Sequence, residues 1–317
     1  MLLISSVIKF KIVFRRYYQL AITVSKAVSM VNLDRISDSV FVHVKGETRA
    51  NIAFIDLGDF IVAVDSGMFP TVAEELRRQI ERIRGKRIRY LIITHYHGDH
   101  VFGNQAYEDC EIIASKKTYE IMAKRLENEW SPEKLKEYIS RNPELAEKLK
   151  GLRIVLPTTT FSSKYVIGKD NNVIEVYEAD GHCDGSVFVY FPKEKVLVAG
   201  DLYFAKMWPY GGDPTVDPYK WVAALEKMLE PGVNIVVPGH GPVTSKEDLA
   251  EYLNFMKMLV RKIEEYVDQG ITIDKIMKME DILSLGPTPK SDNEKYFQRA
   301  TIEKFYEKIK TLRSQEK

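Results

Sequence analysis

Short apolar runs separated by glycine dominate residues 39–114. Runs rich in β-branched and aromatic residues predict strands at 40–44, 52–56, 60–65, 90–93 and 111–114. A helix is predicted over 70–84, because apolar residues recur there on one stripe and Gly85 follows. This alternation of strands and helices favours an α/β (α+β) fold, in which helices cover a sheet.

The pattern changes between residues 116 and 150, where lysine and glutamate dominate and apolar residues are interspersed. Ser131-Pro132 and Asn142-Pro143 are typical helix starts, so two or three short helices are expected. This insertion is interpreted either as a lid or wall over a site, or as a solvated excursion that packs its apolar residues on the sheet.

Strands return between residues 153 and 199, and further helices are predicted after Asp217-Pro218, after Ser245 and from Asp292 to Arg313. The intervening stretch 203–218 is rich in glycine, proline and aromatic residues, which favours a pocket wall over a packed surface loop. The last helix is expected either to cover a sheet edge or to make a dimer contact.

The candidate chemistry begins where the strand at 90–93 ends. His95, His97, Asp99 and His100 follow within one loop, and imidazole nitrogen and carboxylate oxygen both suit zinc-like ions. His95 and His97 occupy alternate positions and can point at one ion, while Asp99 and His100 can point at a second. Gly98 between the pairs allows a sharp turn.

Three further ligand-type residues each follow a predicted strand and adjoin glycine: His182, Asp201 and His240. A sheet can deliver a metal site in this way, on the loops at its strand ends. The remaining histidine, His43, alternates with valines on a strand and is interpreted as a hydrogen-bonded strand residue rather than a ligand.

In this order, the seven residues resemble the signature of the metallo-β-lactamase fold superfamily: His-x-His-x-Asp-His, then a distant His, an Asp and a His. The resemblance covers roughly residues 37–245 and includes the early motif Val-Ala-Val-Asp65-Ser-Gly. It implies an αββα sandwich with the site at one sheet edge, a helical insertion at 116–150 and a C-terminal helical tail at 286–317. Asp65 would support the site from behind, or simply cap a turn.

The resemblance also implies the ligand sets and the activity. His95, His97 and His182 would hold one metal, Asp99, His100 and His240 the other, and Asp201 would bridge them. The expected cofactor is two divalent ions, zinc first and iron or manganese as alternatives. The enzyme would be a dinuclear metal-dependent hydrolase that uses a metal-bridging hydroxide on a small ester, lactone, thioester or phosphoester. Asp99 would be catalytic, orienting the hydroxide and passing its proton to the leaving group.

Two other activities of the same fold remain open: a nuclease or phosphodiesterase, and a sulfur dioxygenase with one iron. Zinc β-lactamases usually lack an aspartate at the position of Asp201, so antibiotic hydrolysis is not expected as the main activity. The tyrosine used by acyl-homoserine lactonases has no certain counterpart, because Tyr203 is only two residues beyond Asp201. Cys183, directly after His182, is expected to fill a small buried slot rather than to act as a ligand or redox group.

Composition narrows the partners. The 317 residues carry a net charge of +1, so no global field recruits nucleic acid or membrane, and a small-molecule substrate is expected. The two cysteines make no disulfide framework, which favours a cytoplasmic protein. Residues 1–29 are basic and are expected to be an extension, from an upstream start codon or an added element, rather than a surface anchor; the domain would span 30–317. A homo-oligomer remains an open alternative.

Overall fold

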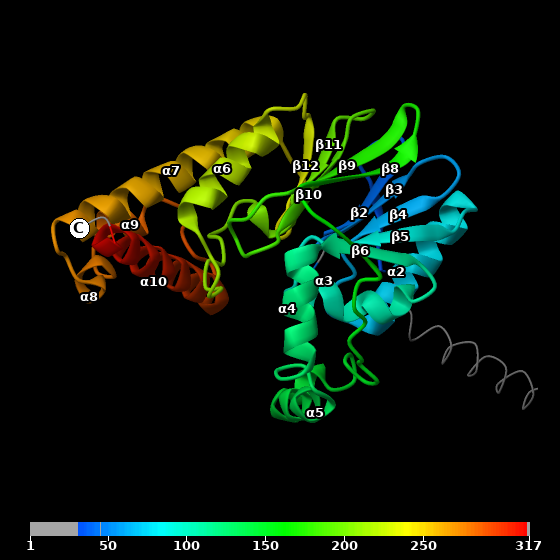
Figure 1. Ribbon diagram of the computed structural model, residues 1–317, viewed down its shortest axis with the longest axis horizontal. Coiled ribbons are helices and arrows are strands. Elements are labelled where there is room, and N and C mark those ends of the chain that lie inside the picture. The colour runs from blue at the N-terminus through cyan, green and yellow to red at the C-terminus, as the bar shows by residue number, and fades with distance from the viewer. Residues whose placement is uncertain (1–30, 45, 316–317) are drawn as a thin grey trace, which may run out of the picture. The chain divides into compact units, whose positions relative to one another are not determined.

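Two β-sheets organise the residues that this computed structural model describes, 31–44 and 46–315 (Figure 1). The first sheet has its strands in sequence order: β1 (Asp34–Arg35), β2 (Val40–His43), β3 (Ile52–Asp56), β4 (Ile61–Val64), β5 (Ile88–Ile92), β6 (Glu111–Ser115) and β7 (Thr159–Phe161). The second sheet has the order β13 (Thr244–Ser245), β12 (Ile235–Val237), β11 (Val196–Val198), β10 (Val187–Phe191), β9 (Asn172–Glu178) and β8 (Lys164–Lys169). Neighbouring strands are antiparallel except from β4 to β7 and between β11 and β12.

The sheets pack face to face and helices cover their outer faces. Valines and isoleucines from both sheets form one shared cluster, including Val62 of β4 and Val189 of β10. Ile61 and Ala63 point to the opposite face because side chains alternate along a strand, yet they are also buried. The helix α2 (Pro70–Arg84) connects β4 to β5 and buries one stripe of its residues. These contacts agree with the αββα arrangement.

Beside the second sheet, α6 (Pro218–Leu229) and α7 (Lys246–Asp268) lie side by side, and α10 (Asp292–Gln315) packs against α7 (Figure 1). Residues of these three helices share a hydrophobic cluster with residues of β10–β12. The expected caps are present. The carboxylate of Asp217 accepts from the first turn of α6, and Ser245 forms a reciprocal capping box with Asp248 at the start of α7. Local side-chain chemistry therefore fixes where both helices begin.

The insertion folds as α4 (Lys116–Leu126), α5 (Pro132–Arg141) and the 3₁₀ turn η2 (Pro143–Leu145), as expected from its two proline-marked starts. Two single-turn helices, α8 (Ile273–Ile276) and α9 (Glu280–Leu283), were not expected. They are too short to show a helical period, and each buries only one residue, Ile276 and Ile282 respectively.

After β5 the chain forms α3 (Gly98–Val101) and continues as the 3₁₀ helix η1 (Phe102–Tyr107). The turn between β8 and β9 lies at residues 170–171, because Asp170 adopts a left-handed conformation and Asn172 already pairs in β9. The predicted extension at 1–29 lies outside the described residues. None of the helices described is both long and apolar enough to cross a membrane.

Candidate metal centre

The loop after β5 is held in place by Asp65, at the end of the neighbouring strand β4. The Asp65 carboxylate accepts hydrogen bonds from the Thr94 amide at 2.8 Å and the Thr94 hydroxyl at 2.7 Å. It also lies 2.7 Å from Nδ1 of His100. Asp65 itself has φ = 62°, a strained backbone for a residue with a side chain. These contacts agree with a supporting role, because they orient one histidine ring of the loop.

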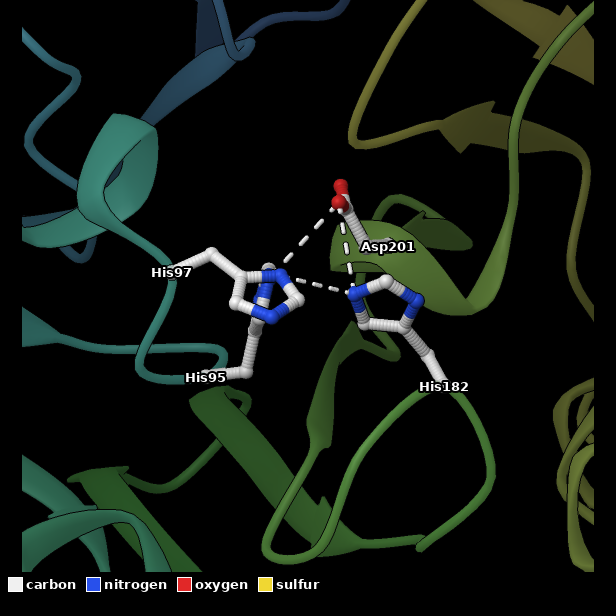
Figure 2. A group of neighbouring side chains, drawn as sticks. All are labelled: His95, His97, His182 and Asp201. Atoms are coloured by element: carbon white, nitrogen blue, oxygen red, sulfur yellow. Dashed lines mark hydrogen bonds and ion pairs between the residues drawn. The ribbon is translucent and has the colours of Figure 1, made fainter. Parts of the chain in front are cut away.

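Four side chains from three loops converge in a first group: His95, His97, His182 and Asp201 (Figure 2). Nδ1 of His97 lies 3.0 Å from Nε2 of His95 and 3.0 Å from Nε2 of His182. Oδ2 of Asp201 lies 3.6 Å from Nε2 of both His95 and His182. The nitrogens expected to share one ion therefore face one point.

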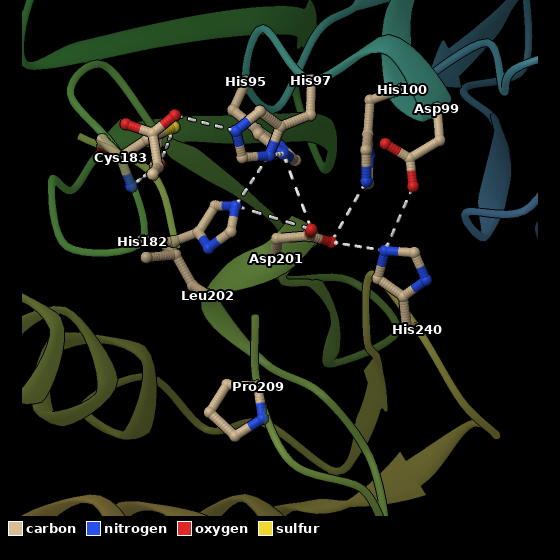
Figure 3. A network of polar contacts seen from close by, with 12 residues as sticks. His95, His97, Asp99, His100, His182, Cys183, Asp201, Leu202, Pro209 and His240 are labelled. Atoms are coloured by element: carbon tan, nitrogen blue, oxygen red, sulfur yellow. Dashed lines mark hydrogen bonds and ion pairs between the residues drawn. The ribbon is translucent and has the colours of Figure 1, made fainter. Parts of the chain in front are cut away.

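The second group contains Asp99, His100 and His240, and Asp201 lies between the two groups (Figure 3). Oδ1 of Asp201 is 3.1 Å from Nε2 of His100 and 3.2 Å from Nε2 of His240. Asp99 Oδ2 is 3.5 Å from Nε2 of His240. One oxygen of Asp201 thus faces each group, as a bridging carboxylate requires.

The spacing of these atoms fits divalent ions. Ligands at about 2.0–2.1 Å from a tetrahedral ion lie about 3.3 Å from one another, which matches the separations above. Nε2 of His100 and Oδ1 of Asp201 are buried and make no aligned hydrogen bond within the described residues, although they are 3.1 Å apart. Buried polar atoms rarely lack a hydrogen-bond partner, and a metal ion bound by both atoms would satisfy them. The donor set, imidazole and carboxylate, suits zinc.

Three members of the first group, His95, His182 and Asp201, are held in the protonation state that a metal needs. Burial lowers the pKa of His95 well below its ordinary value and that of His182 to about 3, despite the attraction of Asp201. Burial opposes the charge on Asp201, but the attraction of His240 and His100 outweighs burial and holds the pKa of Asp201 well below its ordinary value. Neutral imidazoles and an ionised carboxylate can bind a cation without first losing a proton.

The model of the metallo-beta-lactamase superfamily matches residues 46–240, which include all seven of these side chains. This chain belongs to the metallo-beta-lactamase superfamily. A protein named metallo-beta-lactamase type 2 from Bacillus sp. (strain 170) is 24% identical over 246 residues, covering 74% of this chain and 86% of that protein. A linear primary-alkylsulfatase from Pseudomonas sp. (strain ATCC 19151) is 22% identical and covers 71% of this chain, but the match spans only 48% of the alkylsulfatase.

Solved structures show the same fold. A metallo-beta-lactamase from Pontibacter korlensis superposes with a TM-score of 0.54 at 23% identity, covering 71% of this chain and 98% of the other. A metallo beta lactamase from Hirschia baltica gives a TM-score of 0.55 at 18% identity, covering 71% and 97%. The predicted family and its αββα fold are therefore confirmed.

One residue beside the candidate metal centre, Asp213, was missed by the sequence analysis. Its Oδ2 lies 3.0 Å from Nε2 of His97, the nitrogen that faces away from the first group. Its Oδ1 accepts hydrogen bonds from Tyr96 at 2.8 Å and Thr215 at 2.7 Å. Burial disfavours the Asp213 charge, but the bond to His97 outweighs it and lowers the pKa of Asp213. The only signal in the sequence, Asp-Pro-Thr, indicates a turn and says nothing of a histidine 116 residues earlier.

Other candidates fall outside both groups. His43 is buried in β2, and its Nε2 lies 3.1 Å from a carboxylate oxygen of Glu47. Cys183 is buried and its sulfur lies 3.3 Å from the Ser186 hydroxyl, as expected for a residue filling a small slot. The Tyr203 ring is buried against Tyr252 and its hydroxyl accepts from Thr244, so it does not reach the ligands.

A pocket of about 860 Å³ opens over the ligands, with His97, Asp99, Asp201 and His240 in its lining. The stretch 203–218 contributes Phe204, Met207 and Tyr210, which agrees with the predicted pocket wall. The insertion contributes Arg125, Glu129, Trp130, Leu135 and Tyr138, so it forms a wall and is not merely a solvated excursion. The helix α10 also reaches the pocket, which the sequence did not indicate.

Proposed function

We propose that this protein is a dinuclear zinc hydrolase that cleaves a small ester, lactone, thioester or phosphoester. The observation that carries the proposal is the Asp201 carboxylate, whose two oxygens face two separate groups of ligand atoms. A site for a single ion would not need a buried carboxylate turned both ways. Two free, buried cysteines suit the reducing cytoplasm, where we place the protein.

When bound, two divalent ions supply an activated water at neutral pH and polarise the oxygen on which negative charge develops. The residues of the chain set the geometry. Asp201 fixes the separation of the two groups and offsets the charge between them. Asp99 is less buried than Asp201 and lines the pocket, so its carboxylate is placed to orient the attacking water and to carry a proton to the leaving group.

The named relatives support hydrolysis and leave the substrate open. A protein named metallo-beta-lactamase type 2 and a linear primary-alkylsulfatase are 24% and 22% identical to this chain. We expect cephalosporin turnover to be slow, because an aspartate at position 201 departs from the usual zinc β-lactamase pattern.

The test replaces Asp201 with Asn, which keeps the size and removes the charge. Wild-type protein should hold two zinc ions and hydrolyse at least one of a lactone, a thioester and bis(p-nitrophenyl) phosphate faster than a cephalosporin. Asp201→Asn should lower turnover about 100-fold or more, since even residues behind metal ligands contribute 10–100-fold. Metal content, measured by mass spectrometry, should fall most for the ion that Asp99, His100 and His240 would hold.

Asp59→Asn is the matched control, because Asp59 is an exposed turn residue paired with Lys169, outside both ligand groups. It should retain metal and turnover. Full activity in Asp201→Asn, or a wild type that prefers the cephalosporin, would contradict the proposal. One tightly held iron in protein prepared with ample zinc would favour the dioxygenase alternative instead.

A further inference from the structure

The pocket above the ligands has two apolar walls that come from distant parts of the chain. The insertion supplies Trp130, Leu135 and Tyr138, and α10 supplies Tyr296 and Phe297. The α10 wall is continuous with the ligands, because the Tyr210 ring lies 5.3 Å from Phe297 and 6.1 Å from the ring of His97. A molecule whose reacting group is at the ligands can therefore extend along aromatic surface.

Both walls hold aromatic residues in contact with solvent. Tyr138 is 38% exposed and Tyr296 is 56% exposed, the latter more than any other large hydrophobic residue in the described part of the chain. Exposed apolar surface beside a polar centre usually marks a surface that a ligand covers. The two tyrosines belong to different walls of one pocket, so a single ligand that fills the pocket can contact both.

The charged residues of the insertion wall, Arg125 and Glu129, offset each other, so this wall does not favour an ionic group on the ligand. The Arg125 guanidinium lies over the rings of Tyr96 at 4.6 Å and Trp130 at 5.5 Å, and its charge is offset by Glu129 at 3.5 Å. Arg49, which belongs to neither wall, lies over the Phe69 ring at 6.0 Å. A volume of about 860 Å³ also exceeds what a substrate confined to the reacting group requires, since pockets of this size hold drug-sized ligands.

We propose that the substrate carries an uncharged, extended alkyl arm, which lies between the insertion wall and the α10 wall while its hydrolysable group is at the metal ligands. This inference rests on the proposed function for the reacting group. The arm itself is recognised only by protein side chains, so its recognition can be measured without turnover.

The experiment measures the dissociation constants of straight-chain hydroxamic acids, from two to ten carbons, by calorimetry on zinc-loaded protein. The hydroxamate head group binds metal and is the same in every compound, so differences in Kd along the series measure how the protein binds the alkyl arm. Kd should fall up to about fourfold for each added methylene until the walls end, because each buried methylene is worth about that factor. The length dependence should persist, with weaker binding throughout, after zinc is removed with a chelator.

Tyr296→Ala and Tyr138→Ala test the two walls separately, and both positions are exposed enough to keep the fold intact. Each should reduce the ratio of the two-carbon to the eight-carbon Kd by about tenfold, since an aromatic contact surface is lost. Tyr219→Ala is the control, because Tyr219 is a similarly exposed tyrosine on α6 outside the pocket. Its ratio should match the wild type.

Equal Kd values for the two-carbon and eight-carbon compounds would overturn the proposal, as would an unchanged ratio in both wall variants. The two hypotheses fail separately. Length-dependent binding without turnover of any ester, lactone, thioester or phosphodiester would contradict the proposed function alone. Turnover of one of these substrates, together with a Kd that does not depend on chain length, would contradict the alkyl-arm hypothesis alone.

Discussion

At the scale of single residues, His97 is oriented by a carboxylate that the ligand pattern does not include. Asp213 lies 3.0 Å from Nε2 of His97, so it fixes which ring nitrogen faces the first group. Asp213→Asn should weaken zinc binding about 10–100-fold, because the amide cannot hold the imidazole as a carboxylate does. Competition with a chromophoric chelator measures this affinity. Wild-type affinity with a lowered melting temperature would show that Asp213 is only structural.

Asp56 provides a prediction on pH. Its side chain is 2% exposed and lies 2.6 Å from Arg84 and 2.8 Å from Lys86. Burial opposes its charge, but the bonds to Lys86, Gly58 and Arg84 outweigh burial and lower the pKa of Asp56. A lowered pKa adds stability above the unfolded value, about 3.9, and that stability is lost as the pH falls through the folded value.

Asp56→Asn should therefore reduce the free energy of unfolding by about 1–2 kcal/mol at pH 7, since both cationic partners are partly exposed. The difference from wild type should shrink below about pH 4. Urea unfolding at pH 7, 5 and 3 measures the loss of stability and its dependence on pH. Asp59→Asn, at an exposed ion pair in the next turn, should change little at any pH. A difference that grows in acid would contradict the assignment.

At the scale of elements, the parallel strands β11 and β12 bring Asp201 and His240 together only because Gly239 has no side chain. A Cβ there would lie 2.0 Å from Oδ1 of Asp201 and 2.7 Å from the backbone of Gly200. Gly239→Ala should displace the carboxylate, lower zinc content and destabilise the fold by about 1–3 kcal/mol.

Gly232→Ala is the matched control for Gly239→Ala, because its Cβ would meet nothing within 4 Å. It should keep zinc and stability. Metal analysis and thermal unfolding of both variants measure zinc content and stability. Two zinc ions bound to Gly239→Ala with wild-type affinity would show that the loop relaxes and that close approach is not required.

At the scale of the whole molecule, every candidate ligand lies between residues 95 and 240, within the family match at 46–240. Residues 1–29 supply none of them. A protein that starts at Met30 should hold the same zinc content and hydrolyse at the wild-type rate. The comparison requires purified full-length and shortened protein in the same assay. Loss of folding or activity in the shortened form would show that the segment belongs to the catalytic domain.

The sequence by itself determined the family and the layered fold, and it predicted the candidate ligands. Each of these features depends on residues that are close together in the sequence. His95 to His100 occupy one loop, and glycines flank His182, Asp201 and His240. Strands and helices show the hydrophobic period of their own type. The helix starts at Asp217 and Ser245 were equally readable, because a cap acts within one turn. A physical cause that spans a few residues leaves a pattern that can be read along the chain.

Only the tertiary structure decided how those ligands are supported and what lies above them. Asp213 contacts His97 across 116 residues, and the pocket walls join the insertion to α10, which the sequence left as either an edge cover or a dimer contact. Asp201 lies where three strand ends approach closely: a Cβ on Gly239 would lie 2.7 Å from Gly200, and a Cβ on Gly200 would lie 2.7 Å from Thr94 after β5. Such contacts depend on how separate elements pack, and packing leaves no period in the sequence.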